Sequence, residues 1–166
     1  VAEDFTIEEK EEQERMVLES VDRFLERDVE PFAHDLEADD TYPQEIVDKM
    51  VDMGLFGATI GMEYGGLGLS VSTYAKIVER VSTVWMSVSG IFNSHLIMAA
   101  AVERSGTEEQ KAKWLPKFAS GELRGGIALT EPDAGTDLQG IRTRADKSGN
   151  GYALNGAKTW ISNAVE

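Results

Sequence analysis

Residues 130–137, Thr-Glu-Pro-Asp-Ala-Gly-Thr-Asp, bring together more groups suited to ligand chemistry than any other stretch of the chain. They follow the apolar run 127–129, which we expect to form a short buried strand. Pro132 has no backbone N–H and disfavours helix in the residue before it, so the strand should end there and the chain should turn. The loop would then offer backbone N–H groups and the hydroxyls of Thr130 and Thr136 to a planar ligand rich in acceptors. The alternative is a turn that only reverses the chain.

A second stretch, residues 155–163, reads Asn-Gly-Ala-Lys-Thr-Trp-Ile-Ser-Asn. Together the two stretches resemble the paired signatures of the acyl-CoA dehydrogenase flavoproteins, T-E-P-x-A-G-[ST]-D followed by N-G-x-K-x-W-I-[ST]-N. Their order and spacing match the family. The helical pattern before them is similar to the family's amino-terminal domain, so the resemblance covers essentially all 166 residues.

Carried over by position, the resemblance places six residues against FAD: Ile127, Leu129, Thr130, Thr136, Trp160 and Ser162. The first three are expected to meet the flavin ring through backbone and hydroxyl groups. Thr136 is expected to touch the cofactor pyrophosphate or the acyl thioester, so it is also the candidate substrate-binding residue. Trp160 would shield one face of the ring with its flat apolar surface, although it could instead fill a β core. The Ser162 hydroxyl would reach the flavin N5 side.

Two of these positions depart from the commoner family pattern. Ile127 stands where a number of relatives have an aromatic residue, so its contact would be apolar or through the backbone. Ser162 replaces the commoner threonine and keeps the hydroxyl.

The resemblance implies α,β-dehydrogenation of an acyl-CoA thioester. In the family a carboxylate base removes the α proton, the β hydrogen leaves as hydride to FAD, and an electron-transfer flavoprotein reoxidises the cofactor. The base of the relatives lies in a carboxyl-terminal helical domain, so no catalytic residue is assigned here, and the full-length protein is expected to be a homotetramer. Alternatives are an acyl-CoA oxidase or a flavin monooxygenase on the same scaffold, or a non-catalytic helical interaction domain.

The first part of the chain carries helix signals. Thr6 and Glu9 form a capping box, and apolar residues then recur at spacings of three and four as far as residue 32. Pro31 should kink or restart this helix. A short second helix should open at residues 41–43 and end at Gly54, which is a suitable C-cap.

Residues 54–69 are dense in glycine, but predicted helices flank them, so we expect a helix-to-helix loop with positive φ angles rather than a phosphate-binding loop. Ser70 is a candidate N-cap for a long apolar helical pattern that Gly90 and the serines around it should divide into two helices. Thr107 with Gln110 makes a second capping box for a helix ending at residues 120–121.

After Gly125 the pattern alternates. Asn150-Gly151 predicts a hairpin turn between strands at 142–147 and 152–154, and a further turn should precede a strand at 159–161. The predicted fold is therefore mainly α: an antiparallel helical bundle in residues 1–122, followed by the first strands of a β-barrel domain in residues 123–166. About four strands cannot close a barrel, so we expect an amino-terminal portion of a longer protein.

Composition narrows the class further. The chain has 30 acidic and 16 basic residues, a net charge of -14 and a pI near 4.5, which argues against binding to nucleic acid or to an anionic membrane surface. It has no cysteine and no side-chain spacing typical of a metal site. His95 is expected to pack in the core and His34 to be exposed. With no signal peptide or transmembrane run expected, we predict a cytoplasmic protein, although a processed organellar protein would look the same.

Overall fold

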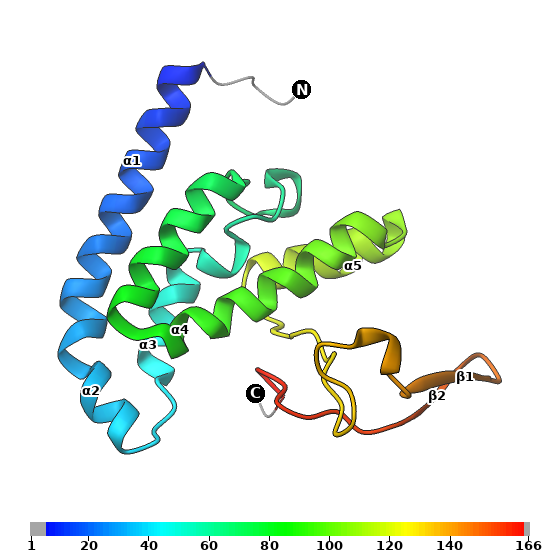
Figure 1. Cartoon of the computed structure of the whole chain (residues 1–166). Helices are drawn as coiled ribbons and strands as arrows, with labels where there is room; N and C mark the ends of the chain where they lie inside the picture. Colours follow the sequence, from blue (N-terminus) through cyan, green and yellow to red (C-terminus); the bar gives the residue numbers. More distant parts are fainter. Residues whose placement is uncertain (1–5, 165–166) are drawn as a thin grey trace.

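The structure is a computed structural model that describes residues 6–164 (Figure 1). The chain is described as two parts: the helical region, residues 6–122, and the β segment, residues 123–164. The longer elements of the helical region are α1 (Ile7–Phe24), α2 (Glu30–Ala38), α3 (Gln44–Asp52), α4 (Val71–Ser105) and α5 (Glu108–Ala119). The β segment contains the strands β1 (Arg144–Ser148) and β2 (Gly151–Asn155). The predicted fold class, a helical bundle followed by β structure, is confirmed.

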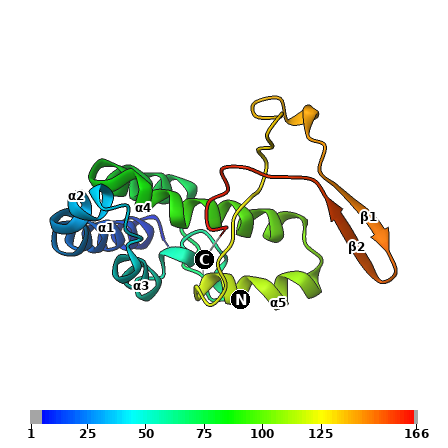
Figure 2. The same ribbon diagram turned by 90° about the horizontal axis from the view of Figure 1, so that it is seen from below.

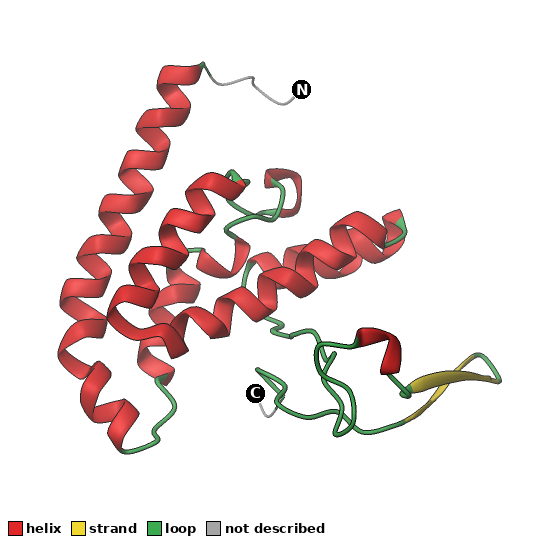
Figure 3. Ribbon diagram, viewed as in Figure 1, coloured by secondary structure: helices red, strands yellow, loops and turns green. Residues whose placement is uncertain are grey.

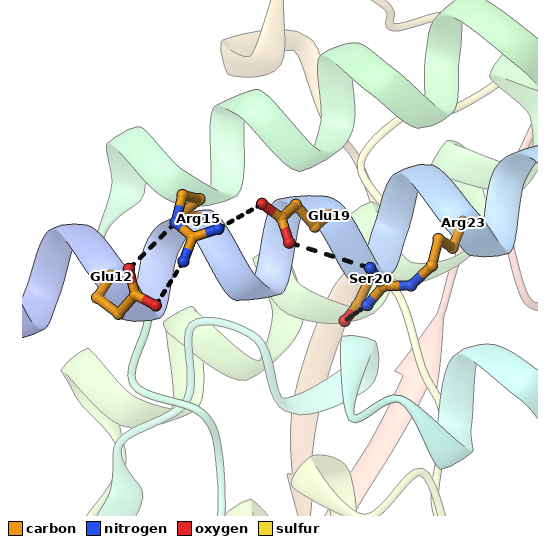
Figure 4. Close-up of polar contacts among 5 residues, drawn as sticks. All are labelled: Glu12, Arg15, Glu19, Ser20 and Arg23. Carbon is orange, nitrogen blue, oxygen red and sulfur yellow. Dashed lines mark hydrogen bonds and ion pairs between the residues drawn. The ribbon is translucent and has the colours of Figure 1, made fainter.

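Helix α1 begins at the predicted capping box. The Thr6 backbone N–H donates to the Glu9 carboxylate at 2.7 Å, and the Glu9 N–H donates to the Thr6 hydroxyl at 3.2 Å. On the outer face of the helix, Arg15 donates to the carboxylates of Glu12 at 2.6 Å and Glu19 at 2.7 Å (Figure 4). Salt screens such exposed pairs, so they contribute little to the stability of the fold.

The predicted interruption at Pro31 is present. A π-helical turn, Leu25–Val29, ends α1, and α2 restarts with Pro31 in its first turn, where a missing N–H costs no helical hydrogen bond. Asp28 in this turn is buried and accepts hydrogen bonds from Arg27 at 2.7 Å and Lys49 at 2.8 Å. These two cations lower the pKa of Asp28 to about 2, and the Lys49 contact ties α3 to the turn.

The glycine-rich loop connects α3 to α4 and has positive φ angles, as predicted. Gly54 ends the helix with φ 74°, and Gly65 and Gly68 also adopt positive φ. The loop folds back on itself, since the Leu67 N–H donates to the Gly57 carbonyl at 2.9 Å. A Cβ at Gly66 would lie 2.1 Å from the Ile60 carbonyl oxygen, so this close packing requires glycine there.

Helix α4 starts at the predicted N-cap Ser70 but breaks at a different residue than expected. Trp85 has φ -155° and ψ 100°, while Gly90 lies within the helical second half, so the predicted division at Gly90 is wrong. The Trp85 indole N–H and the Ser87 hydroxyl both donate to the carboxylate of Glu37 in α2. This contact between distant segments fixes the kink that is visible in Figure 1.

The hydrophobic core lies where α1, α3, α4, α5 and the Leu55–Gly57 turn meet. His95 is fully buried there, as predicted; its Nε2 lies 3.1 Å from the Phe118 carbonyl oxygen, and its ring meets Phe56 and Phe118 edge to face. Burial lowers the pKa of His95. His34 is exposed, also as predicted.

By length and composition alone, α4 is apolar enough to cross a membrane, which we did not expect from the sequence. The residues that make it so include Ile77, Val81, Phe92 and Leu96, all of which are buried in the core. The same composition is therefore what a central core helix requires.

The β segment is mostly loop, drawn green in Figure 3, and its hairpin projects away from the helices in Figure 2. Strands β1 and β2 pair antiparallel with Ser148 opposite Gly151, so the two-residue turn is Gly149-Asn150, one position earlier than predicted. Gly149 takes φ 57° in that turn, and the first strand begins at Arg144 rather than at residue 142. The expected strand at 159–161 is absent from the described residues, because Trp160 adopts φ 58°.

Candidate functional site

The two signature stretches, residues 130–137 and 155–163, lie side by side. The Thr159 N–H donates to the Thr130 carbonyl at 3.0 Å, and the Lys158 ammonium donates to the Leu129 carbonyl at 2.9 Å. The chain between them runs out through the hairpin and back, as Figure 2 shows. Residues far apart in sequence are thus brought to one place.

The turn at Pro132 forms as predicted. The Glu131 N–H donates to the Ala134 carbonyl at 2.8 Å, and the Ala134 N–H donates to the Glu131 carbonyl at 3.2 Å. The run 127–129 before it is extended but is no strand, and Leu129 is 45% exposed, so the expectation of a buried strand is wrong. No strand of the described chain pairs with this run, which leaves its backbone without a ladder.

Glu131 is the residue that the sequence reasoning missed. Its buried carboxylate accepts hydrogen bonds from the backbone N–H groups of Arg142 and Thr143, each at 2.8 Å, and lies 2.9 Å from the Lys158 ammonium. The Thr143 hydroxyl, the Arg142 amide and the Lys158 ammonium lower the pKa of Glu131 to about 2. The available signal was the pair of stretches itself: Lys158 is the one charged residue of the second signature, and the charged residues of the first are all acidic.

At two positions near the signatures, glycine allows separate segments of the chain to pack closely together. A Cβ at Gly156 would lie 2.1 Å from the Thr143 hydroxyl oxygen, and a Cβ at Gly126 would lie 2.9 Å from the Ser162 carbonyl oxygen. Gly156 can therefore pack directly against Thr143, and Ser162 directly against Gly126.

The six predicted site residues are presented to solvent rather than packed inside the protein. Four of them, Leu129, Thr136, Trp160 and Ser162, are exposed, and the other two, Ile127 and Thr130, are half-buried. The structure brings Ile127, Leu129 and Thr130 beside the stretch that carries Trp160 and Ser162, and places Thr136 beyond the turn. Trp160 is 92% exposed, so it does not fill a β core within the described chain.

This surface has groups that suit a flavin dinucleotide. The flat indole of Trp160 is free to cover a planar ring, and the hydroxyls of Thr130 and Ser162 can bond its heteroatoms. At Gly135 a Cβ would meet nothing within 4 Å, so the glycine leaves open space beside the loop instead of accommodating the protein's own atoms. A phosphate can approach the backbone closely at such a position.

An open groove of about 310 Å³ continues from Ser162 toward the helical region. It is lined by Tyr42, Ser87, Gly90, Ile91 and Ile161, among others. Within residues 6–164 no three histidine or acidic side chains gather in a way that would hold a metal ion. The arrangement is thus suited to binding and orienting a ring-shaped ligand.

Family models match both parts of the chain. The model described as acyl-CoA dehydrogenase, N-terminal domain, matches residues 11–122, and the one described as acyl-CoA dehydrogenase, middle domain, matches residues 126–166. The chain belongs to the acyl-CoA dehydrogenase family. The resemblance read from the two signatures is confirmed.

Curated relatives in this family include (2S)-methylsuccinyl-CoA dehydrogenase of Cereibacter sphaeroides, 39% identical over 93% of this chain and 28% of its own length. Another is the short-chain specific acyl-CoA dehydrogenase of Clostridium acetobutylicum, 38% identical over 91% of this chain and 40% of its own. Mitochondrial isovaleryl-CoA dehydrogenases also match, so the relatives come from bacteria and from mitochondria.

Solved structures share the fold. One, of the electron transferring flavoprotein of Acidaminococcus fermentans in work on flavin-based electron bifurcation, has TM-score 0.88 and 34% identity, covering 98% of this chain and 42% of that one. The acyl-CoA dehydrogenase of Bacillus anthracis complexed with FAD has TM-score 0.80 and 32% identity over 98% of this chain and 28% of that one. The chain thus spans less than half the length of these relatives.

Proposed function

We propose that residues 1–166 belong to an FAD-dependent acyl-CoA dehydrogenase that removes hydrogens from the α and β carbons of an acyl-CoA thioester. In this proposal residues 1–122 form the helical amino-terminal domain, and residues 123–166 begin the middle domain that holds the flavin. The observation that carries the proposal is the joining of the two signatures by Glu131 and Lys158, 2.9 Å apart, with the predicted ligand residues facing outward. An acyl-CoA dehydrogenase relative with bound FAD supports the choice of cofactor.

The chain's own residues would bind and orient. Backbone groups at Ile127 and Leu129 and the Thr130 hydroxyl would meet the edge of the flavin ring. Trp160 would cover one face of the ring and exclude water from it, and the Ser162 hydroxyl would donate toward N5. The bound FAD would supply the redox chemistry, by accepting the hydrogen from the β carbon as hydride.

Thr136 has a separate part in the proposal. It follows Gly135, where the backbone is open, so its hydroxyl and N–H would touch the cofactor pyrophosphate or the thioester of the substrate. Among residues 1–166, we therefore propose Thr136 as a candidate contact for both the cofactor and the substrate.

The remaining functions would come from outside these residues. We propose that a carboxylate base and the other walls of the pocket lie elsewhere in the protein, that an electron-transfer flavoprotein accepts the electrons, and that the complete protein is a homotetramer. The match to a structure concerned with an electron transferring flavoprotein supports the choice of acceptor. A bacterial cytoplasmic location is consistent with the relatives from Cereibacter and Clostridium.

The visible spectrum of the complete protein tests the proposal. We expect a yellow protein whose flavin absorbance is bleached by an acyl-CoA in the absence of oxygen and restored by an electron-transfer flavoprotein. Restoration by oxygen at a comparable rate would instead indicate an oxidase or a monooxygenase. A purified protein that stays colourless and takes up no added FAD would refute the flavoenzyme assignment.

A further inference from the structure

The return stretch, residues 156–163, is fastened at two ends with a strained backbone between them. At one end Lys158 contacts Glu131 and the Leu129 carbonyl. Toward the other end Trp160 and Asn163 adopt φ 58° and 61°, in the left-handed region that a bulky side chain such as tryptophan rarely enters. A conformation of this kind persists only where the surroundings hold it in place.

Asn163 is the fastening at the second end. Its side-chain amide Nδ2 donates to the carbonyl of Ile91 in α4 at 3.1 Å and to the carbonyl of Gly125 at 3.0 Å. Both amide hydrogens are used, and an aspartate of the same shape would have none to give. Asparagine also tolerates positive φ better than most residues. One side chain thus joins the second half of α4, the start of the β segment and the end of the second signature.

The contact bears directly on the proposed flavin residues. Ser162 precedes Asn163 in the chain. A Cβ at Gly126 would lie only 2.9 Å from the Ser162 carbonyl oxygen, so the backbones of Gly126 and Ser162 are in contact. Since Lys158 already fixes one end, the placement of Trp160 and Ser162 relative to α4 depends on the other end. We propose that Asn163 is a positioning residue, which sets the Trp160 ring and the Ser162 hydroxyl against the flavin by anchoring them to α4.

This inference rests on the proposed function and is tested in the complete protein loaded with FAD. Asn163→Gly keeps the positive φ and removes the amide, whereas Asn163→Asp keeps the shape and replaces the donors with acceptors. Asn150→Ala is the control, because Asn150 is exposed in the hairpin turn and lies outside both signatures. Far-UV circular dichroism confirms that each variant retains the helical region.

We expect both Asn163 variants to bind FAD about 10-fold more weakly, the effect of losing roughly one net hydrogen bond. At saturating FAD they should show a shifted flavin absorption band and reduction by acyl-CoA about 10-fold slower, with little change in KM. Amide hydrogen exchange at residues 159–163 should be faster than in the wild type. The control should match the wild type in every one of these measurements.

The outcomes separate the two claims. If the wild-type protein binds FAD, an unchanged FAD affinity, spectrum and reduction rate in Asn163→Gly would overturn the positioning role alone. A wild-type protein that takes up no FAD would overturn the proposed function and this inference with it.

Discussion

The helical region and the β segment are held together in different ways. The buried core residues of the helical region lie between Leu18 and Ala119 and come from every α-helix but α2. Among the described residues after 122, only Ala134 is a buried hydrophobic residue, and the central buried group is the carboxylate of Glu131. The helical region is stabilised by apolar burial, whereas the β segment depends on a few directed polar contacts.

The apolar side chains of the β segment show what this difference means for function. Trp160 is 92% exposed, Leu154 77% and Tyr152 71%, and together with Leu129 they form surfaces that nothing in the described chain covers. Exposure on this scale marks surfaces that ligands or other protein segments cover. We therefore interpret the β segment as part of a site that is completed by groups outside residues 1–166.

The largest expected effect uses the same substitution in both regions. Leu115→Ala, in the core at 0% exposure, should lower the free energy of unfolding by about 2–5 kcal/mol, because it leaves a cavity. Leu154→Ala, in β2, should change it by less than about 0.5 kcal/mol. Urea unfolding followed by circular dichroism at 222 nm measures both. Equal losses would show that the β segment has an apolar core after all.

Ser162→Ala tests whether a residue of the β segment affects flavin reduction without affecting stability. Removing the hydroxyl should slow flavin reduction in the complete protein by roughly 5- to 150-fold, equivalent to about 1–3 kcal/mol for a buried hydrogen bond. Its unfolding should be unchanged, because Ser162 is exposed in the described chain. Ser148→Ala, at an exposed serine of β1, is the matched control. Unchanged reduction kinetics together with an unchanged flavin potential would remove Ser162 from the site.

A smaller effect is expected at the cap of α5. The Thr107 hydroxyl accepts from the Gln110 N–H at 3.2 Å, so Thr107→Ala should lower the free energy of unfolding by about 1 kcal/mol. Thr107→Ser retains the oxygen and should recover most of that loss. Thermal unfolding of the three proteins gives the comparison, and a serine variant as unstable as the alanine variant would argue against capping.

The smallest effect on global unfolding is expected from protonation of Glu131. The structural change that follows should stay within the β segment. The folded pKa of about 2 lies below the ordinary value of 4.5, so the unfolded chain binds more protons in this interval. Glu131 therefore contributes fully to the free energy of unfolding above pH 4.5, and this contribution is lost as the pH falls from there through about 2. NMR should show the Glu131 carboxyl titrating near 2 along with the amides of Arg142 and Thr143. A midpoint near 4.5, or Glu131→Gln leaving these amides unmoved, would contradict the account.

The sequence predicted best what is determined locally. The capping boxes at Thr6 and Thr107 and the helix end at Gly54 each depend on residues within a few positions, and each is confirmed. The kink at Trp85 could not be predicted, because the residue that Trp85 contacts there, Glu37, lies 48 positions away in the chain.

The same physical reason limited the prediction of the site. The hairpin follows from its glycines and asparagine, and even there the turn lies one residue earlier than expected. The expected strands at 127–129 and 159–161 need partners that the described chain lacks, and the left-handed Trp160 excludes regular pairing in the second of them. Glu131 acquires its importance only when Lys158 lies beside it, which no local pattern reveals.

The titration of FAD into two proteins, the complete chain and residues 1–166 alone, tests the central claim most directly. A ligand of this size is normally enclosed over roughly 70–90% of its surface, and the exposed Trp160 and Ser162 offer only one wall. By flavin fluorescence we predict tight, submicromolar binding to the complete protein and binding too weak to saturate at micromolar concentrations for residues 1–166. Submicromolar binding by residues 1–166, or no binding by the complete protein, would contradict the account of an open partial site.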